Sequence, residues 1–289
     1  MADSGTGIQE GRRTTARAGA EPPLSRTERL RRLILDAPYE ICVERARYYT
    51  ESYRQSEGLH PALRAARAFA HTLKNMTVYI LDEEAIVGNR SGKLVAAVIP
   101  VERGEINTVL EMELDQLTRR AVRPFRISES EKRELVSEIL PYWRGKTIRD
   151  RKKQLWREHG LYFPMKFTAA SLRDRARGFG IRGLYRLAAT AKGNLKTLAR
   201  AGEELAFNNP GLVMNVFDVQ GHLVLGHNYL LPGGLAGARK RAEEGLARRG
   251  DDPEARAFYE AVIISCDAGK KFAERFAERV GRRVAGRGS

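Results

Sequence analysis

The 289-residue sequence is poor in cysteine and contains only Cys42 and Cys266. The two lie far apart, form no Cys-x-x-Cys pair and have no cluster of histidines beside them. The sequence therefore predicts no zinc site or other metal centre. Nothing in the pattern favours a disulfide, and a reducing, cytoplasmic location is expected.

Long hydrophobic runs are also missing. No stretch of about 18 consecutive apolar residues occurs, so no membrane-spanning helix is predicted. The first residues, up to about Pro23, lack the apolar segment of a secretory signal. Their Gly, Ala, Thr, Arg and Ser content predicts a disordered tail over residues 1–24. Residues 281–289 are expected to be a flexible C-terminus.

Acidic residues are outnumbered: 36 Asp and Glu face 51 Lys and Arg, which gives a net charge of +15. Such an excess is typical of proteins that neutralise phosphates, and it is most concentrated between Arg144 and Arg157. The basic residues are nevertheless spread along the whole chain and mixed with acidic ones. No zinc finger, aromatic RNA-binding motif or recognition helix accompanies them, which argues against nucleic acid. A basic helical module that binds nucleic acid or an acidic partner is the alternative function.

Apolar periodicity and capping signals predict a mainly α-helical protein with a few short strands. Ser25-Arg-Thr-Glu28, Ser128-Glu-Ser-Glu131 and Thr147-Ile-Arg-Asp150 have the pattern of helix N-termini. Short strands or extended segments are expected within 78–81, 85–90 and 94–99. The predicted helices cover 25–36, 38–58, 61–76, 106–117, 128–140, 147–158, 171–177, 184–205, 233–249 and 253–280.

Several predicted helices have a clear apolar face. In 38–58 this face is formed by Val43, Ala46, Tyr49 and Tyr53, and Cys42 is placed on the same helix. In 128–140 it is formed by Leu135, Val136, Ile139 and Leu140, and Pro141 is expected to end the helix. Gly269 marks either a break in the last helix or a close contact with another helix. The stripe of that last helix consists of Phe258, Val262, Ser265, Gly269, Phe272, Phe276 and Val280.

Four stretches, taken in order, carry a resemblance to a known family. The first is Glu40-Ile-Cys-x-Glu-Arg-Ala-Arg47 with Thr50-Glu-Ser-Tyr53 and Glu57-Gly58. The others are Ile86-Val-Gly-Asn-Arg90, then Pro124-Phe-Arg-Ile-Ser128 leading to Ile139-Leu-Pro-Tyr-Trp-Arg-Gly-Lys-Thr147, and finally Gly221-His222 followed by Leu231-x-x-Gly-Leu-x-Gly237. Together they resemble the opening of the pyruvate formate-lyase-like domain of glycyl radical enzymes. The resemblance covers about Thr27 to Val280.

Because chains of that family are much longer, the resemblance implies the N-terminal portion of a glycyl radical enzyme α/β barrel, truncated, over residues 25–280. The complete enzyme would be an anaerobic lyase, dehydratase or decarboxylase that acts on a small oxygenated or carboxylated substrate. A radical S-adenosylmethionine enzyme would activate it. This chain would be a fragment, a truncated gene product or one half of a split enzyme, and in the last case a complementary C-terminal half would supply the rest of the barrel. A glycyl radical is expected only in that complete enzyme.

The resemblance also implies that this chain contains no catalytic residue of its own and is inactive alone. The family's radical-forming cysteine lies mid-chain, whereas Cys42 and Cys266 fall on helices and are expected to be packing residues. Arg283-Val-Ala-Gly286 is similar to the family's radical glycine motif. Arg287 replaces the aromatic residue of that motif, however, and the intervening barrel is missing.

His222 is the candidate substrate-binding residue. In family members that resemble diol dehydratases, the matching histidine lies near a substrate hydroxyl, where an imidazole can donate, accept or take up a proton. A histidine that satisfies a buried backbone group is the other interpretation. Leu225, Gly226 and His227 stand where the family often has Pro-Asp-Tyr, which leaves an aryl-acid decarboxylase or another lyase open. We expect His222 to face a cavity, and we expect Asn89 and Arg90 to hold backbone groups in place.

Overall fold

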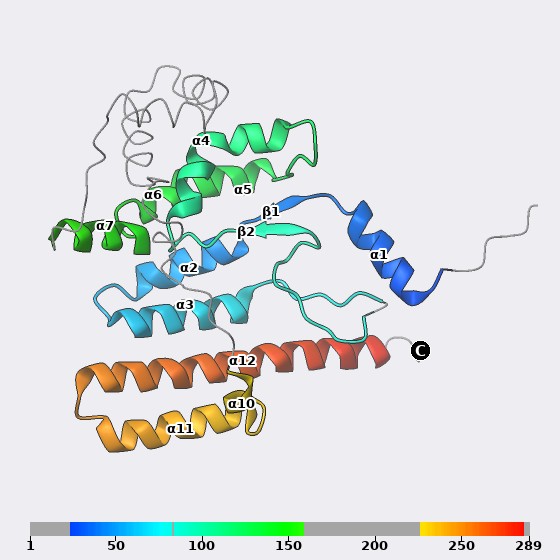
Figure 1. Cartoon of the computed structure of the whole chain (residues 1–289). Coiled ribbons are helices and arrows are strands. Elements are labelled where there is room, and N and C mark those ends of the chain that lie inside the picture. The colour runs from blue at the N-terminus through cyan, green and yellow to red at the C-terminus, as the bar shows by residue number, and fades with distance from the viewer. Residues whose placement is uncertain (1–23, 83, 159–225, 286–289) are drawn as a thin grey trace, which may run out of the picture.

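The computed structural model describes residues 24–82, 84–158 and 226–285 (Figure 1). Within these ranges the chain is mostly helical with two short strands, as predicted. The elements are α1 (Arg26–Asp36), β1 (Glu40–Cys42), α2 (Glu44–Gln55), α3 (Pro61–Asn75), β2 (Ala96–Val98), α4 (Glu105–Arg119), α5 (Glu129–Glu134), the π-helical turn η1 (Leu135–Ile139), α6 (Leu140–Trp143), α7 (Ile148–Glu158), α10 (His227–Leu230), α11 (Gly234–Arg249) and α12 (Pro253–Ala285). The helices predicted at 171–177 and 184–205 lie outside the described residues.

The predicted helix N-termini are confirmed by their capping bonds. The Ser25 and Ser128 hydroxyls each accept the backbone N–H of the glutamate three residues later, and that glutamate accepts the serine N–H in return. Thr147 and Asp150 form the same reciprocal pair, with both backbone bonds at 3.1 Å. These bonds satisfy amides that have no partner inside the helix, and for this reason they fix where each helix begins.

The prediction of one helix over 38–58 is wrong at its N-terminal end. Residues Glu40–Cys42 form β1, which runs parallel to β2 with Ile41 opposite Ala97, and α2 begins only at Glu44. Cys42 therefore lies on a strand and not on a helix. The Glu40 N–H donates to the Val95 carbonyl at 2.9 Å. Here the pairing with a strand that is distant in sequence overrides the local helical pattern. Short-range periodicity cannot reveal such a pairing.

Only one of the strands expected between 78 and 99 forms, namely β2. The described remainder of this stretch consists of turns, bends and irregular backbone, and Asn89 holds it, as expected from its turn-forming character. Its amide nitrogen donates to the carbonyls of Thr77 at 2.8 Å and Ser91 at 2.6 Å, and its amide oxygen accepts the N–H of Tyr79 at 3.2 Å. One side chain thus clamps both arms of the loop.

The main core lies between α2, α4 and the 135–143 segment. Leu135, Ile139 and Leu140 are buried as predicted, but Val136 is 45% exposed. The expected end at Pro141 is also wrong, because the helix continues to Trp143. The Leu140 N–H donates to the Leu135 carbonyl, a π-type bond that widens the turn and accommodates a proline that has no N–H to donate.

A second packing layer is formed by α3, α11 and α12. Figure 1 shows α11 and α12 as an antiparallel pair, with α12 running alongside α3. Small buried residues, Ala257, Ala261 and Ala268, let α12 approach its neighbours. The helix is unbroken at Gly269, where an added Cβ would lie 3.0 Å from Leu235, so this glycine marks a close helix contact. Of the predicted stripe, Phe276 is buried but Phe258 is 57% exposed. No described helix has both the length and the apolarity required to span a membrane.

Candidate functional site

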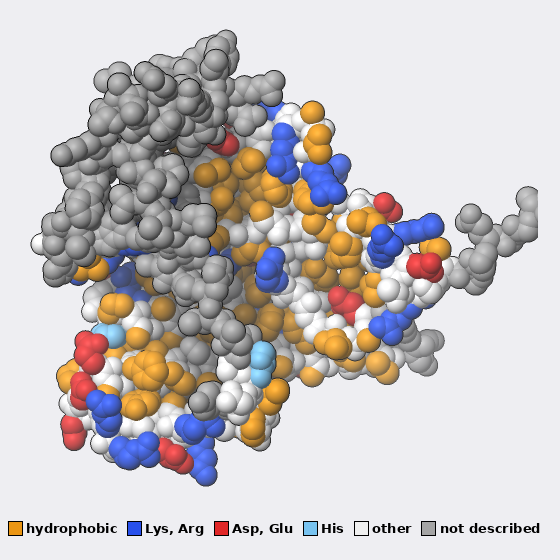
Figure 2. Space-filling model, viewed as in Figure 1, with side chains coloured by type: hydrophobic (Ala, Val, Ile, Leu, Met, Phe, Trp, Pro, Cys, Tyr) orange, Lys and Arg blue, Asp and Glu red, His pale blue; other side chains and the backbone are white. Residues whose placement is uncertain are grey.

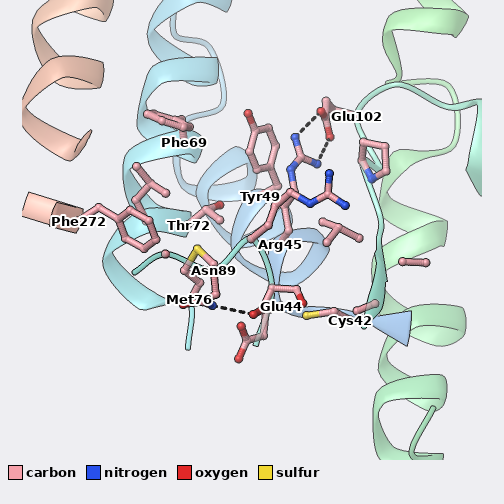
Figure 3. Close-up of a pocket in the computed structure, with 18 of the residues that line it drawn as sticks. Cys42, Glu44, Arg45, Tyr49, Phe69, Thr72, Met76, Asn89, Glu102 and Phe272 are labelled. Atoms are coloured by element: carbon pink, nitrogen blue, oxygen red, sulfur yellow. Dashed lines mark hydrogen bonds and ion pairs between the residues drawn. The ribbon is translucent and has the colours of Figure 1, made fainter. Parts of the chain in front are cut away.

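The β2-edge groove is the cavity bounded by β2, residues 88–91, and side chains of α2, α3 and α12 (Figure 3). Its volume is about 750 Å³, which is within the range of sites that bind small molecules or short segments. Its apolar wall consists of Phe69 on α3, Met76 at the C-cap of α3 and Phe272 on α12. The groove thus joins parts of the chain that are far apart in sequence.

One end of the groove is polar. The Arg45 guanidinium donates to both carboxylate oxygens of Glu102, at 2.8 and 2.6 Å. It also lies 4.2 Å from the centroid of the Tyr49 ring. Burial raises the pKa of the Tyr49 phenol to about 12, although the nearby Arg45 charge acts in the opposite direction. Tyr49 is therefore a neutral hydrogen-bonding group at physiological pH.

Glu44 and Cys42 have structural roles at the base of the groove. The Glu44 carboxylate accepts the N–H of Thr77 at 3.0 Å and also the Thr77 hydroxyl. It packs so tightly on Gly92 that an added Cβ there would overlap the carboxylate. Cys42 is only 1% exposed, and burial raises the pKa of its thiol. A neutral, enclosed thiol is a poor nucleophile, which fits the expected packing role.

Cys266 has a similar environment on α12, where the sequence predicted it. It is 7% exposed, and burial, followed by the nearby Asp267 charge, raises its thiol pKa. Both cysteines are unpaired thiols. The first three residues of the Arg283-Val-Ala-Gly286 stretch belong to α12. Arg283 pairs with Asp82 and donates a hydrogen bond to the Ile80 carbonyl. Gly286 lies outside the described residues.

His222 also lies outside the described residues, so its expected position beside a cavity remains a prediction. The end of its motif is described: Leu231 is 75% exposed, and Gly234 has a positive φ of 57° at the start of α11. His227, which replaces part of the family pattern, is exposed on α10. Within the described ranges no group of three or more His, Cys, Asp or Glu side chains could hold a metal ion.

Several basic side chains of the stretch 144–157 contact other parts of the protein. The Arg144 guanidinium pairs with Glu111 at 3.1 Å, Lys146 lies 4.2 Å from the Tyr142 ring centroid, and Arg149 is 7% exposed. On the face shown in Figure 2, Lys and Arg side chains of the described residues are interspersed with acidic and apolar ones. On this face, the described residues form no continuous basic surface of the kind that a phosphate backbone requires.

The sequence motif includes Arg45 but gave it no role in a site, and Glu102 and Phe272 were missed as groove residues. No pattern around Glu102 or Phe272 indicates a site, because each becomes important only through a tertiary contact. The motif residues Arg45 and Asn89 prove to have structural roles: one forms an ion pair and the other clamps a loop.

The family model described as pyruvate formate lyase-like matches residues 20–285. The chain belongs to this family. Among curated relatives of this pyruvate formate lyase-like chain, (2S)-3-sulfopropanediol dehydratase of Klebsiella oxytoca is 30% identical over 263 residues, with 89% of this chain and 27% of the relative covered. Isethionate sulfite-lyase of Oleidesulfovibrio alaskensis is 29% identical over 247 residues, with 82% of this chain and 25% of the relative covered.

Solved structures agree with this family. The glycerol-bound, B12-independent glycerol dehydratase of Clostridium butyricum is 26% identical with a TM-score of 0.60, and the match covers 91% of this chain and 28% of that one. A glycyl radical enzyme of Archaeoglobus fulgidus matches in fold with a TM-score of 0.63 at 23% identity, over 89% of this chain and 28% of that one. This pyruvate formate lyase-like chain thus spans about a quarter of the length of these relatives.

Proposed function

We propose that this chain forms the N-terminal part of a glycyl radical lyase or dehydratase and is inactive alone. Two observations carry the proposal together. The family model matches residues 20–285, which is most of this chain, but the chain covers only 27% of the length of the dehydratase relative. The radical-bearing glycine and the hydrogen-abstracting cysteine would belong to the remaining polypeptide. That polypeptide is either a continuation of this chain or a complementary C-terminal half.

The substrate class follows from what the relatives act on. The relatives are named for a sulfonated propanediol, isethionate and a hydroxyproline, and a related structure holds glycerol. All four are small molecules with a hydroxyl on a saturated carbon. We propose the same class for the complete enzyme, which would cleave or dehydrate its substrate. No decarboxylase is among these relatives, so that branch of the initial prediction receives no support from them.

Within the complete enzyme, this chain would supply part of the outer wall of the barrel and a group that binds the substrate. A radical S-adenosylmethionine enzyme would generate the glycyl radical in the complete enzyme, and this radical would enable the cysteine of the remaining polypeptide to abstract a hydrogen atom. His222 would hold the substrate hydroxyl and accept or donate its proton. Cys42 and Cys266 would contribute packing only, since both thiols are buried and neutral. We also propose a cytoplasmic location, because both cysteines remain unpaired.

The test compares this chain alone with the product of the coding sequence that follows it, either as one polypeptide or as two co-expressed ones. Each is incubated anaerobically with a radical S-adenosylmethionine activating enzyme and with glycerol, isethionate, 3-sulfopropanediol or trans-4-hydroxyproline. We expect a glycyl signal in electron paramagnetic resonance, and turnover, only with the complete assembly.

The Gly286→Ala variant of this chain is the matched control for the radical assignment. It should leave the signal of the complete assembly unchanged. A glycyl signal on this chain alone that Gly286→Ala abolishes would overturn the proposal. The absence of a downstream polypeptide that binds this chain and restores radical formation would overturn it as well.

A further inference from the structure

A second groove, here called the α3–α12 groove, is lined by side chains of α2, α3 and α12. Its volume is about 790 Å³, which is within the range of sites that bind small molecules. Figure 1 shows α12 running alongside α3, so both helices can supply side chains to one ligand. None of the described residues lines both this groove and the β2-edge groove, which makes it a separate site.

The α3–α12 groove holds positive charge that the protein itself does not neutralise. Four cations that line it have no carboxylate partner among the described residues: Arg67, Lys74, Lys271 and Arg275. The Arg275 guanidinium donates to the Leu73 carbonyl and, at 2.7 Å, to the Met76 carbonyl. These carbonyls fix its position at the end of α3 but leave its charge uncompensated.

The carboxylates that line the groove are mostly engaged elsewhere. Asp267 accepts a hydrogen bond from Arg239 of α11 at 2.8 Å, and Glu274 lies 3.8 Å from Lys270 on its own helix. Glu278 is the remaining carboxylate among the described lining residues, and it forms no ion pair with any of them. The cations without a carboxylate partner therefore outnumber the free carboxylates.

Neutral hydrogen-bonding groups from α2 complete the lining. Ser52 is only 5% exposed, and its hydroxyl has no hydrogen-bond partner among the described residues. Gln55 also lines the groove with an amide that bonds to no described residue. Enclosed polar groups of this kind normally have a partner, so a ligand with several acceptor oxygens would satisfy them together with the cations.

We propose that the α3–α12 groove binds a phosphate-bearing small molecule, a role beyond the proposed lyase or dehydratase chemistry. A phosphate monoester carries a charge of about −1.5 to −2 at neutral pH, which matches several cations better than a single carboxylate does. Its tetrahedral oxygens accept from donors on several sides, as α2, α3 and α12 provide here. A bound phosphate would therefore bridge α3 and α12 and stabilise the folded chain.

Calorimetric titration of the full chain with inorganic pyrophosphate tests the inference. Chloride keeps the ionic strength constant, because exposed charges are screened by salt. We expect one saturable site and a rise of the thermal unfolding midpoint with pyrophosphate concentration. Polyglutamate is titrated in parallel, since an acidic protein segment is the other occupant that the charges of this groove could attract.

Lysine variants locate the site. Lys74→Gln and Lys271→Gln each remove one charge from opposite sides of the groove and should weaken pyrophosphate binding about fivefold, as expected for one partly screened charge. The matched control is Lys240→Gln, which removes an exposed, unpaired lysine of α11 outside the groove and should leave binding unchanged. Glu278→Gln should tighten binding, because it removes a repelling carboxylate. Circular dichroism checks that each variant is folded.

The outcomes separate a specific site from general attraction by a basic chain. Absence of saturable pyrophosphate binding would overturn the inference, and so would equal weakening by Lys240→Gln, Lys74→Gln and Lys271→Gln. Tighter binding of polyglutamate than of pyrophosphate would overturn it in favour of an acidic protein partner. None of these results depends on radical formation, so the proposed function stands or falls independently.

Discussion

The indole N–H of Trp143 donates a 2.9 Å hydrogen bond to the hydroxyl of Thr50, and both side chains are buried. The same hydroxyl donates to the Ala46 carbonyl at 2.7 Å. A single threonine thus satisfies a core tryptophan and links α2 to α6 across a long stretch of sequence. A buried indole N–H without an acceptor would be costly, so this contact fixes how the 135–143 segment sits on α2.

Thr50→Val should destabilise the fold without changing its shape. Valine matches threonine in volume but leaves the Trp143 N–H without an acceptor, which costs about 1–3 kcal/mol. Chemical denaturation followed by tryptophan fluorescence measures the effect. The control is Thr118→Val, whose hydroxyl bonds only to the nearby Asp115 carbonyl near the surface and should matter by less than about 0.5 kcal/mol. Equal effects of the two substitutions would contradict the role of Thr50.

Glu131 should make stability depend on pH. Burial raises the pKa of its carboxyl, but the hydrogen bonds from Lys93 and Ser128 outweigh this, so the pKa lies below its ordinary value of 4.5. The stabilisation is therefore complete above that value and is lost as pH falls through the lower pKa of the folded state. Glu131→Gln keeps the helix cap but removes the ion pair with Lys93. It should cost roughly 1–2 kcal/mol at pH 7 and progressively less below about pH 4.

The matched control for Glu131 is Glu28→Gln. Glu28 forms the same capping box on α1 but has no lysine partner like Lys93. Its substitution should change the midpoint of urea unfolding less than Glu131→Gln does at pH 7. If the difference in free energy of unfolding between wild type and Glu131→Gln stayed constant down to pH 3, the ion pair would contribute nothing to stability.

Two glycines on α11 should respond in opposite directions to alanine. An added Cβ at Gly245 would overlap the ring of Tyr259 on α12, whereas at Gly237 the nearest atom is an Arg241 guanidinium nitrogen at 3.5 Å. Gly237→Ala should raise stability by up to about 1 kcal/mol through helix propensity. Gly245→Ala should lower it by about 1–3 kcal/mol because the tightly packed helices must separate. Thermal unfolding distinguishes them, and stabilisation by Gly245→Ala would contradict the observed packing.

His222 should matter for turnover of the complete enzyme and His227 should not. His222→Gln keeps a hydrogen-bonding group but cannot take up a proton, so kcat/KM should fall by about 10²–10⁴-fold. His227→Gln changes an exposed side chain and should stay within about threefold of wild type. The glycyl signal should form in both variants, which separates loss of chemistry from loss of activation. Unchanged turnover in His222→Gln would remove this residue from the site.

Part of this fold could be predicted from local sequence. Capping residues such as Ser25 and Ser128 fix helix starts through bonds that span three residues, and these starts are confirmed. Pro61 opens α3 as expected, with Ala66 buried on its inner face. The position of the first strand was not predictable, because Ile41 adopts β structure only through partners at Ala97 and Arg126. Val136 lies in the π turn before Pro141 and is exposed, and a regular helical period, which predicted it as buried, does not allow for that turn.

The sequence by itself determined the family and the mainly helical character of the described residues, because these depend on residue order and short-range bonding. Only the tertiary structure decided that Cys42 lies on a strand, that Glu102 neutralises Arg45 and that β2 lines an apolar groove. The physical reason is that these features arise from contacts between segments far apart in the chain. Their energies appear only when the backbone brings the segments together.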